Sequence, residues 1–189
     1  MQPTWLRRIM LVRLAKRYIW EKQSIAIRGN DIPITPMDVY HIMDLPIQGD
    51  DISIRLKNEK RNENLLAAYG VDGKLELAHL ETLMKASTTP DHHFIRIFAL
   101  YAIGTIIAPT SKSYVDSSYL NLVENVADLP KFNWGCFTLN HLLRSIRQFN
   151  ERNQVCLQGN LALLQVSDTT IVLLSSTIDM MNICLSLTN

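Results

Sequence analysis

Apolar residues recur at three- and four-residue spacing along much of the chain, which is the period of an amphipathic helix. This spacing predicts helices over residues 4–20, 74–86, 92–108, 117–126, 133–149 and 155–166, with a charged helix or loop over 58–70. The segment 92–108 is apolar on almost every side, so it is predicted to be buried nearly all round. The chain is therefore predicted to be mainly α.

Residues 24–34 depart from the helical period, because apolar and polar positions alternate there. Gly29-Asn30 lies between the two apolar arms, and both residue types tolerate the positive φ of a tight turn. This segment is predicted to form a β-hairpin. The expected fold is a compact multi-helix domain with a small β-hairpin near its N-terminus.

A run of turn-forming and helix-capping residues follows the hairpin. Thr35 can cap a helix, Pro36 suits its first position, and Asp38 stands where a carboxylate meets free N–H groups. Leu45-Pro46 is predicted to end this helix, because the residue before a proline is driven out of the α region. Gly49 is predicted to make a further turn. Each of these residues has a structural reason to be where it is.

Basic residues are concentrated near the start of a chain whose net charge is only +1. Residues 1–22 contain six basic residues against Glu21 alone. Two interpretations stay open, a solvated basic helix face and a contact with nucleic acid or a nuclear partner. The residues predicted for such a contact are Arg7, Arg8, Arg13, Lys16 and Arg17.

The three cysteines, Cys136, Cys156 and Cys184, are far apart and form no CxxC motif, which argues against a disulfide scaffold and a zinc site. Cys136 and His141 are five residues apart on one predicted helix, so their side chains point about 140° apart. We therefore predict a packed cysteine rather than a catalytic pair.

Other candidate groups also favour structural explanations. Asp38 and His41 are within reach of each other on one helix, but a cap and a polar surface residue explain them. His92-His93 lies at a predicted helix start, and Arg96 four residues after His92 would repel a metal cation. No metal site is predicted.

The bulk sequence also argues against a cofactor and a membrane span. Pyridoxal phosphate needs a lysine in a pocket and a phosphate-binding glycine-rich loop, and the chain offers neither pattern. The longest apolar stretch, 97–111, is shorter than the roughly 20 residues of a membrane-spanning helix. We predict that the chain is not an enzyme and that it binds no small-molecule substrate or cofactor. We also predict that it does not contact a membrane.

Three blocks of the sequence resemble the plant mobile domain family, many of whose members carry an aminotransferase-like label. The first block is residues 24–52, in which an ITxxDVxxIxxLPxxG pattern follows the hairpin. The second is residues 94–146, which contain the NW start of a predicted helix. The third is residues 154–165. The positions that match the family pattern are Ile34, Thr35, Asp38, Val39, Ile42, Leu45, Pro46, Gly49, Pro109, Asn133 and Trp134.

The resemblance implies a transposon-derived, non-enzymatic domain that acts as an interaction scaffold. Its host relatives act in the nucleus, in gene and transposon silencing and in meristem maintenance. Protein partners are implied, nucleic acid is the alternative partner, and the cytoplasm is the alternative location. A detached accessory domain of a transposon-encoded cysteine protease or transposase is the competing interpretation.

The composition changes after residue 165, and residues 166–189 contain two charged residues and no aromatic one. Relatives of the plant mobile domain usually continue here with an aromatic-rich helix. We therefore predict a domain over 1–165 that is truncated at its C-terminal end, followed by an atypical apolar tail. A genuine apolar closing helix and a decayed, non-functional fragment are the alternatives.

Overall fold

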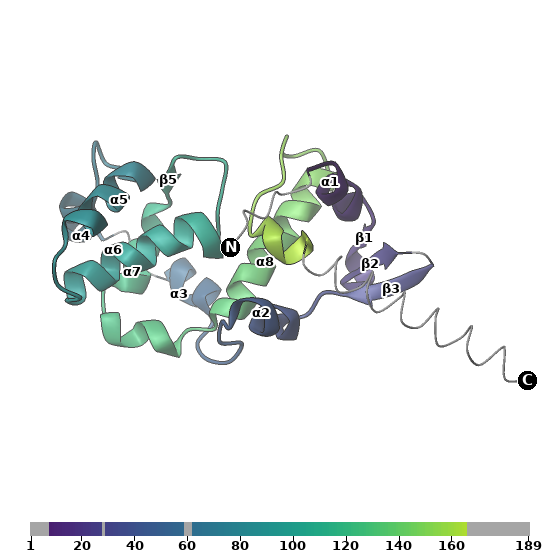
Figure 1. Cartoon of the computed structure of the whole chain (residues 1–189), viewed down its shortest axis with the longest axis horizontal. Helices are drawn as coiled ribbons and strands as arrows, with labels where there is room; N and C mark the ends of the chain where they lie inside the picture. The colour runs from purple at the N-terminus through teal and green to yellow at the C-terminus, as the bar shows by residue number, and fades with distance from the viewer. Residues whose placement is uncertain (1–7, 28, 59–61, 166–189) are drawn as a thin grey trace, which may run out of the picture.

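Among the described residues the longest helix is α8 (Trp134–Asn150), which packs against elements from the first and middle parts of the chain (Figure 1). A computed structural model of the protein describes residues 8–27, 29–58 and 62–165. Two clusters of buried side chains form the core, one built mainly by the N-terminal elements and one mainly by the central elements. Because α8 contributes side chains to both clusters, it joins the two halves of the fold.

Short helices make up most of the fold. The N-terminal elements are α1 (Arg8–Lys16), β1 (Tyr18–Ile19), the 3-10 turn η1 (Trp20–Lys22), β2 (Ser24–Ile27), β3 (Asn30–Pro33) and α2 (Pro36–Met43). The next elements are α3 (Ile52–Asn58), α4 (Glu63–Tyr69), β4 (Leu75–Glu76), α5 (Leu77–Ala86), α6 (His92–Ala102) and the π-helix η2 (Ile103–Ile107). Before α8 come β5 (Tyr114–Val115), η3 (Ser117–Tyr119), α7 (Leu120–Val123) and η4 (Val126–Lys131).

The predicted fold class is confirmed, since helices dominate and a small antiparallel sheet lies near the N-terminus. The predicted hairpin is the β2–β3 pair, in which Ile25 faces Ile32 across the ladder. The strand β1 adds a third strand on the other side of β2. Among the described residues no helix is long and apolar enough to cross a membrane.

The prediction of a single helix over 4–20 is wrong beyond residue 16. Tyr18 pairs with Ile25 as part of β1, and the chain then turns through η1. The helical spacing of residues 17–20 is overridden because the edge of the β2–β3 hairpin offers backbone partners to this segment. Residues 4–7 lie outside the described part of the chain.

The predicted cap of α2 is present. The backbone N–H of Thr35 donates to Asp38 Oδ2 at 2.7 Å, and the Thr35 hydroxyl donates to the same oxygen at 2.8 Å. Pro36 takes the first helical position. The helix ends at Met43, because Asp44 adopts the left-handed conformation with φ 54°, so the turn begins just before the predicted Leu45-Pro46 stop.

The loop after α2 docks on the start of α8 through hydrogen bonds between distant parts of the chain. The N–H of Asp50 donates to the Lys131 carbonyl at 2.8 Å, and the N–H of Asn133 donates back to the Asp50 carbonyl at 3.0 Å. The N–H of Gly135 donates to the Pro46 carbonyl at 2.8 Å. The loop therefore satisfies backbone groups that the end of a helix leaves without partners.

Several central predictions hold with shifted boundaries. The amphipathic helix predicted over 74–86 begins at Leu77, because Leu75 and Glu76 form β4 instead. Leu75 and Leu80 are fully buried, as expected. The helix predicted over 133–149 corresponds to α8. The short helix predicted over 117–126 corresponds to η3 and α7, a 3-10 turn followed by one α-helical turn.

Three other central predictions need correction. The segment 92–108 is helical but not buried all round, because Phe98 and Ile106 are about half exposed on its outer face. The segment predicted as an exposed helix or loop includes α4, whose Leu66 and Tyr69 are buried. Residues 155–160 form an irregular loop and only residues 161–165 are helical, since the chain must bend there to pass α8.

We predict that Gly49→Ala destabilises the protein by roughly 2–5 kcal/mol. Gly49 has φ +120°, and an added Cβ would lie 2.1 Å from the Lys131 carbonyl oxygen, so strain and overpacking combine. Gly29→Ala is the matched control, because its φ is also positive at +84° but nothing lies within 4 Å of the added Cβ. Its expected cost is about 1–2 kcal/mol.

Urea unfolding followed by circular dichroism measures both variants against the parent chain. Equal losses at the two glycines would contradict the docking of the loop on α8.

Candidate partner interface

The exposed face of α1 is basic. Leu11, Leu14 and Ala15 face the core. The exposed basic residues in and just after the helix are Arg8, Arg13, Lys16 and Arg17. None of these four forms an ion pair with another described residue. Arg7, the fifth predicted contact residue, lies outside the described part of the chain. The predicted basic face of this helix is therefore exposed and its charges are available to a partner.

An exposed tryptophan lies close to this basic face. Trp20 is 41% exposed, and the guanidinium carbon of Arg147 on α8 lies 4.8 Å from the centroid of its ring. Tyr18 packs against the same ring edge-on, at a centroid distance of 6.1 Å. Arg147 also donates through Nε to the Glu151 carboxylate at 2.8 Å. The indole is thus held by a cation on one face and an aromatic edge beside it.

The end of α8 lies against the end of α1 (Figure 1). The Asn150 side chain donates to the Ala15 carbonyl at 2.9 Å and fixes this contact. A hollow of about 730 Å³ opens beside it, with walls formed by Lys16, Phe149, Asn150, Arg152, Gln154 and Val155. Cationic and apolar groups therefore line the same depression, and Val155 is 97% exposed there.

These residues form one surface, which we call the α1–α8 basic surface. Arg13 precedes Lys16 by three residues, so the two side chains are neighbours on α1, and Arg17 directly follows the helix. The surface comprises Arg13, Lys16, Arg17, Trp20, Arg147 and Arg152. Guanidinium and ammonium groups bind phosphate and carboxylate oxygens, and an exposed indole offers a flat apolar face.

The residues of the family pattern lie elsewhere, in the contacts that hold the fold together. Ile34 and Val39 are buried in the N-terminal core, and Leu45 packs against both core clusters. The Asn133 side chain accepts from the Cys136 N–H at 2.9 Å and donates to the Ile47 carbonyl at 2.8 Å.

Two further pattern residues are buried or hydrogen-bonded near α8. The Nε1–H of Trp134 donates to the Leu129 carbonyl at 2.8 Å, and the ring packs edge-on against Phe132 and Phe137. The Pro109 carbonyl accepts from the Gly159 N–H at 2.8 Å. These side chains act through packing and backbone contacts.

The candidate catalytic pairs do not form catalytic arrangements among the described residues. Asp38 is engaged by Thr35, and His41 is exposed beside Tyr40. Cys136 Sγ lies 4.0 Å from the Ile47 carbonyl, and no described contact joins it to His141.

The histidines at the start of α6 are exposed, and His93 contacts a neighbouring aromatic side chain. His93 Nδ1 lies 3.2 Å from the Tyr69 hydroxyl, and the two rings pack with centroids 5.2 Å apart. No three His, Cys, Asp or Glu side chains of the described segments gather where they could hold a metal ion.

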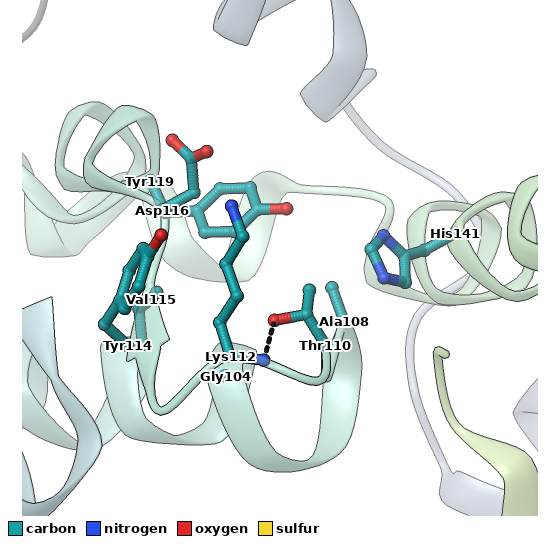
Figure 2. A pocket seen from close by; sticks show the side chains of 9 residues that line it. All are labelled: Gly104, Ala108, Thr110, Lys112, Tyr114, Val115, Asp116, Tyr119 and His141. Atoms are coloured by element: carbon teal, nitrogen blue, oxygen red, sulfur yellow. Dashed lines mark hydrogen bonds between the residues drawn. The ribbon is translucent and has the colours of Figure 1, made fainter. Parts of the chain in front are cut away.

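A small cavity between the 110–119 segment and α8 was not predicted from the sequence. Its volume is about 170 Å³, and its lining includes Lys112, Asp116, Tyr119 and His141 (Figure 2). The Tyr119 hydroxyl points toward His141, which reaches in from α8. Tyr119 carries no motif in the sequence, and its position depends on how the connector folds over α8, so no sequence signal identifies it.

Burial dominates the protonation of both side chains. It raises the pKa of Tyr119, and the Asp116 carboxylate adds to this effect. It lowers the pKa of His141, although the hydrogen-bonded Pro109 carbonyl opposes the shift. His141 Nε2 is buried and has no hydrogen-bond partner among the described residues. Both shifts therefore favour the neutral forms of the two side chains.

The described residues form a mainly α domain, and an exposed basic surface lies where α1 meets the end of α8. The family model described as Domain of unknown function (DUF8566) matches residues 1–165, so the chain belongs to that family. No curated protein and no solved structure matches the sequence.

We predict that the stability of the protein falls as the pH drops below about 6.5, the ordinary pKa of histidine, in part because of His141. Its folded-state pKa is depressed, so the unfolded chain binds the proton more readily and acid favours unfolding. The loss begins near the unfolded pKa and continues until the pH reaches the lower folded pKa.

His141→Gln should flatten this part of the profile, measured as urea midpoints between pH 5 and 7.5. His92→Gln, at the exposed start of α6, is the matched control and should keep the slope of the parent. An unchanged slope in His141→Gln would contradict the assignment to His141.

Proposed function

We propose that this chain is a non-enzymatic interaction domain that acts in the nucleus and contacts an anionic partner through the α1–α8 basic surface. The observation that carries the proposal is the exposure of Arg13, Lys16 and Arg17, none of which pairs with a described acid. A concentration of unpaired cations on one surface attracts anions.

The resemblance to the plant mobile domain supports the remaining parts of the proposal. It implies a transposon-derived scaffold connected with gene and transposon silencing and with meristem maintenance. The residues that carry the resemblance serve packing and backbone contacts in this fold, as with Thr35, Asp38 and Asn133. Packing and backbone contacts explain these residues without a catalytic role, which favours a scaffold over an enzyme.

We expect the full chain, tagged with a fluorescent protein in plant cells, to stay in the nucleus after detergent permeabilisation. A triple Lys16→Gln/Arg17→Gln/Arg152→Gln variant removes three exposed cations from the basic surface and should be retained several-fold less, because the attraction to an anionic partner weakens. The control is Lys57→Gln/Lys85→Gln/Lys112→Gln, which removes the same charge from exposed residues of the other half of the fold.

Retention that is equal for the two triple variants would contradict the proposed surface. Transaminase activity or binding of pyridoxal phosphate by the purified chain would contradict the non-enzymatic assignment.

A further inference from the structure

We propose that the partner held by the α1–α8 basic surface is a single-stranded nucleic acid, with one base stacked on Trp20 and the phosphates bound by Lys16, Arg17 and Arg152. This inference rests on the proposed function and narrows its anionic partner to one class. Three features of the surface support it.

The first feature is the segregation of charge along the chain. Residues 8–22 carry five basic residues and one acidic residue, and residues 147–152 carry two basic and one acidic. The chain as a whole has a net charge of +1, so its remaining residues are acidic overall. The α1–α8 contact brings the two basic segments together, although they are more than 120 residues apart in sequence. A polyanion is therefore attracted to this end of the molecule and repelled by the rest.

The second feature is the environment of Trp20. Arg147 occupies one face of the indole, and Tyr18 meets the ring edge-on. The ring is nonetheless 41% exposed, which leaves surface for another flat group. Single-stranded nucleic-acid proteins combine such an aromatic platform with a cationic groove, and the stacking tolerates any base. A cation already stacked on an indole also pre-orders the ring, which lowers the entropy cost of binding.

The third feature is the hollow between α1 and the end of α8. Lys16 and Arg152 stand at its walls next to Phe149 and the exposed Val155. A flexible strand can place a sugar or a second base against these apolar side chains while its phosphates meet the cations. A paired duplex keeps its bases stacked on one another, so it cannot use Trp20 or the apolar wall in this way. The carboxylates of an acidic peptide would use the cations, but they do not stack on the indole.

The test measures fluorescence anisotropy of labelled 20-nucleotide oligothymidine, oligouridine and a 20-base-pair DNA duplex with the purified full chain. We expect both single strands to bind more tightly than the duplex, with affinity that falls steeply as salt rises. Trp20→Leu keeps the apolar volume but removes the π-face, and should weaken single-strand binding about tenfold. Trp20→Phe should retain most of the affinity.

Two control variants separate stacking from general effects. Phe98→Ala removes an exposed aromatic ring from α6, in the other half of the fold, and should bind like the parent chain. The Lys16→Gln/Arg17→Gln/Arg152→Gln variant should reduce the slope of log affinity against log salt by about 2, since each lost phosphate contact contributes about 0.7. Circular dichroism melts confirm that each variant is folded.

Three results would overturn the inference: equal affinity for duplex and single strands, parental affinity in Trp20→Leu, and no binding at low salt. Nuclear retention tests the proposed function separately from oligonucleotide binding. If oligonucleotides do not bind but nuclear retention still depends on the three cations, the proposed function stands and the single-stranded partner is wrong. If retention is also independent of these cations, both proposals fail.

Discussion

The docking of the loop over residues 46–50 on the start of α8 is the interaction on which the rest of the structure depends. The two partners are about 85 residues apart in sequence, and Asp50 exchanges hydrogen bonds with the Lys131–Asn133 backbone. An N-terminal helical turn leaves N–H groups without intrahelical partners, and Pro46 accepts one of them from Gly135. Phe132 and Trp134 are buried beside this contact, so it connects the exposed loop to the core.

Once the start of α8 is fixed, the direction and length of this helix determine where its other end lies. The helix is 17 residues long and ends beside α1, where the Asn150 side chain donates to the Ala15 carbonyl. Lys16 and Arg147 lie in the last turns of their helices, where cations also stabilise the negative end of the helix dipole. These two residues therefore have a local stabilising effect as well as a place in the basic surface. Trp20 has no such local explanation for its exposure, which makes it the more informative residue.

Local signals in the sequence predicted local structure well, whereas contacts between distant segments were out of reach. The cap formed by Thr35 and Asp38 and the turn at Gly29 depend on a few consecutive residues, so their chemistry is readable from the chain. Trp20 was placed in a helix, because its spacing fits that period and the competing partner, the hairpin edge, is a tertiary feature. The cavity beside His141 depends on a connector with little periodicity, so nothing in the sequence indicated it.

The three blocks of the plant mobile domain resemblance gain a physical interpretation from these contacts. The loop of the first block docks on the Asn133 turn of the second, and the Gly159 N–H of the third binds the Pro109 carbonyl of the second. An added Cβ at Gly159 would lie 2.9 Å from the Leu142 backbone, so the third block also passes close to α8. Residues that fit together in this way constrain one another whatever the domain binds. The pattern therefore describes contacts within the fold, and it includes neither Trp20 nor the cations around it.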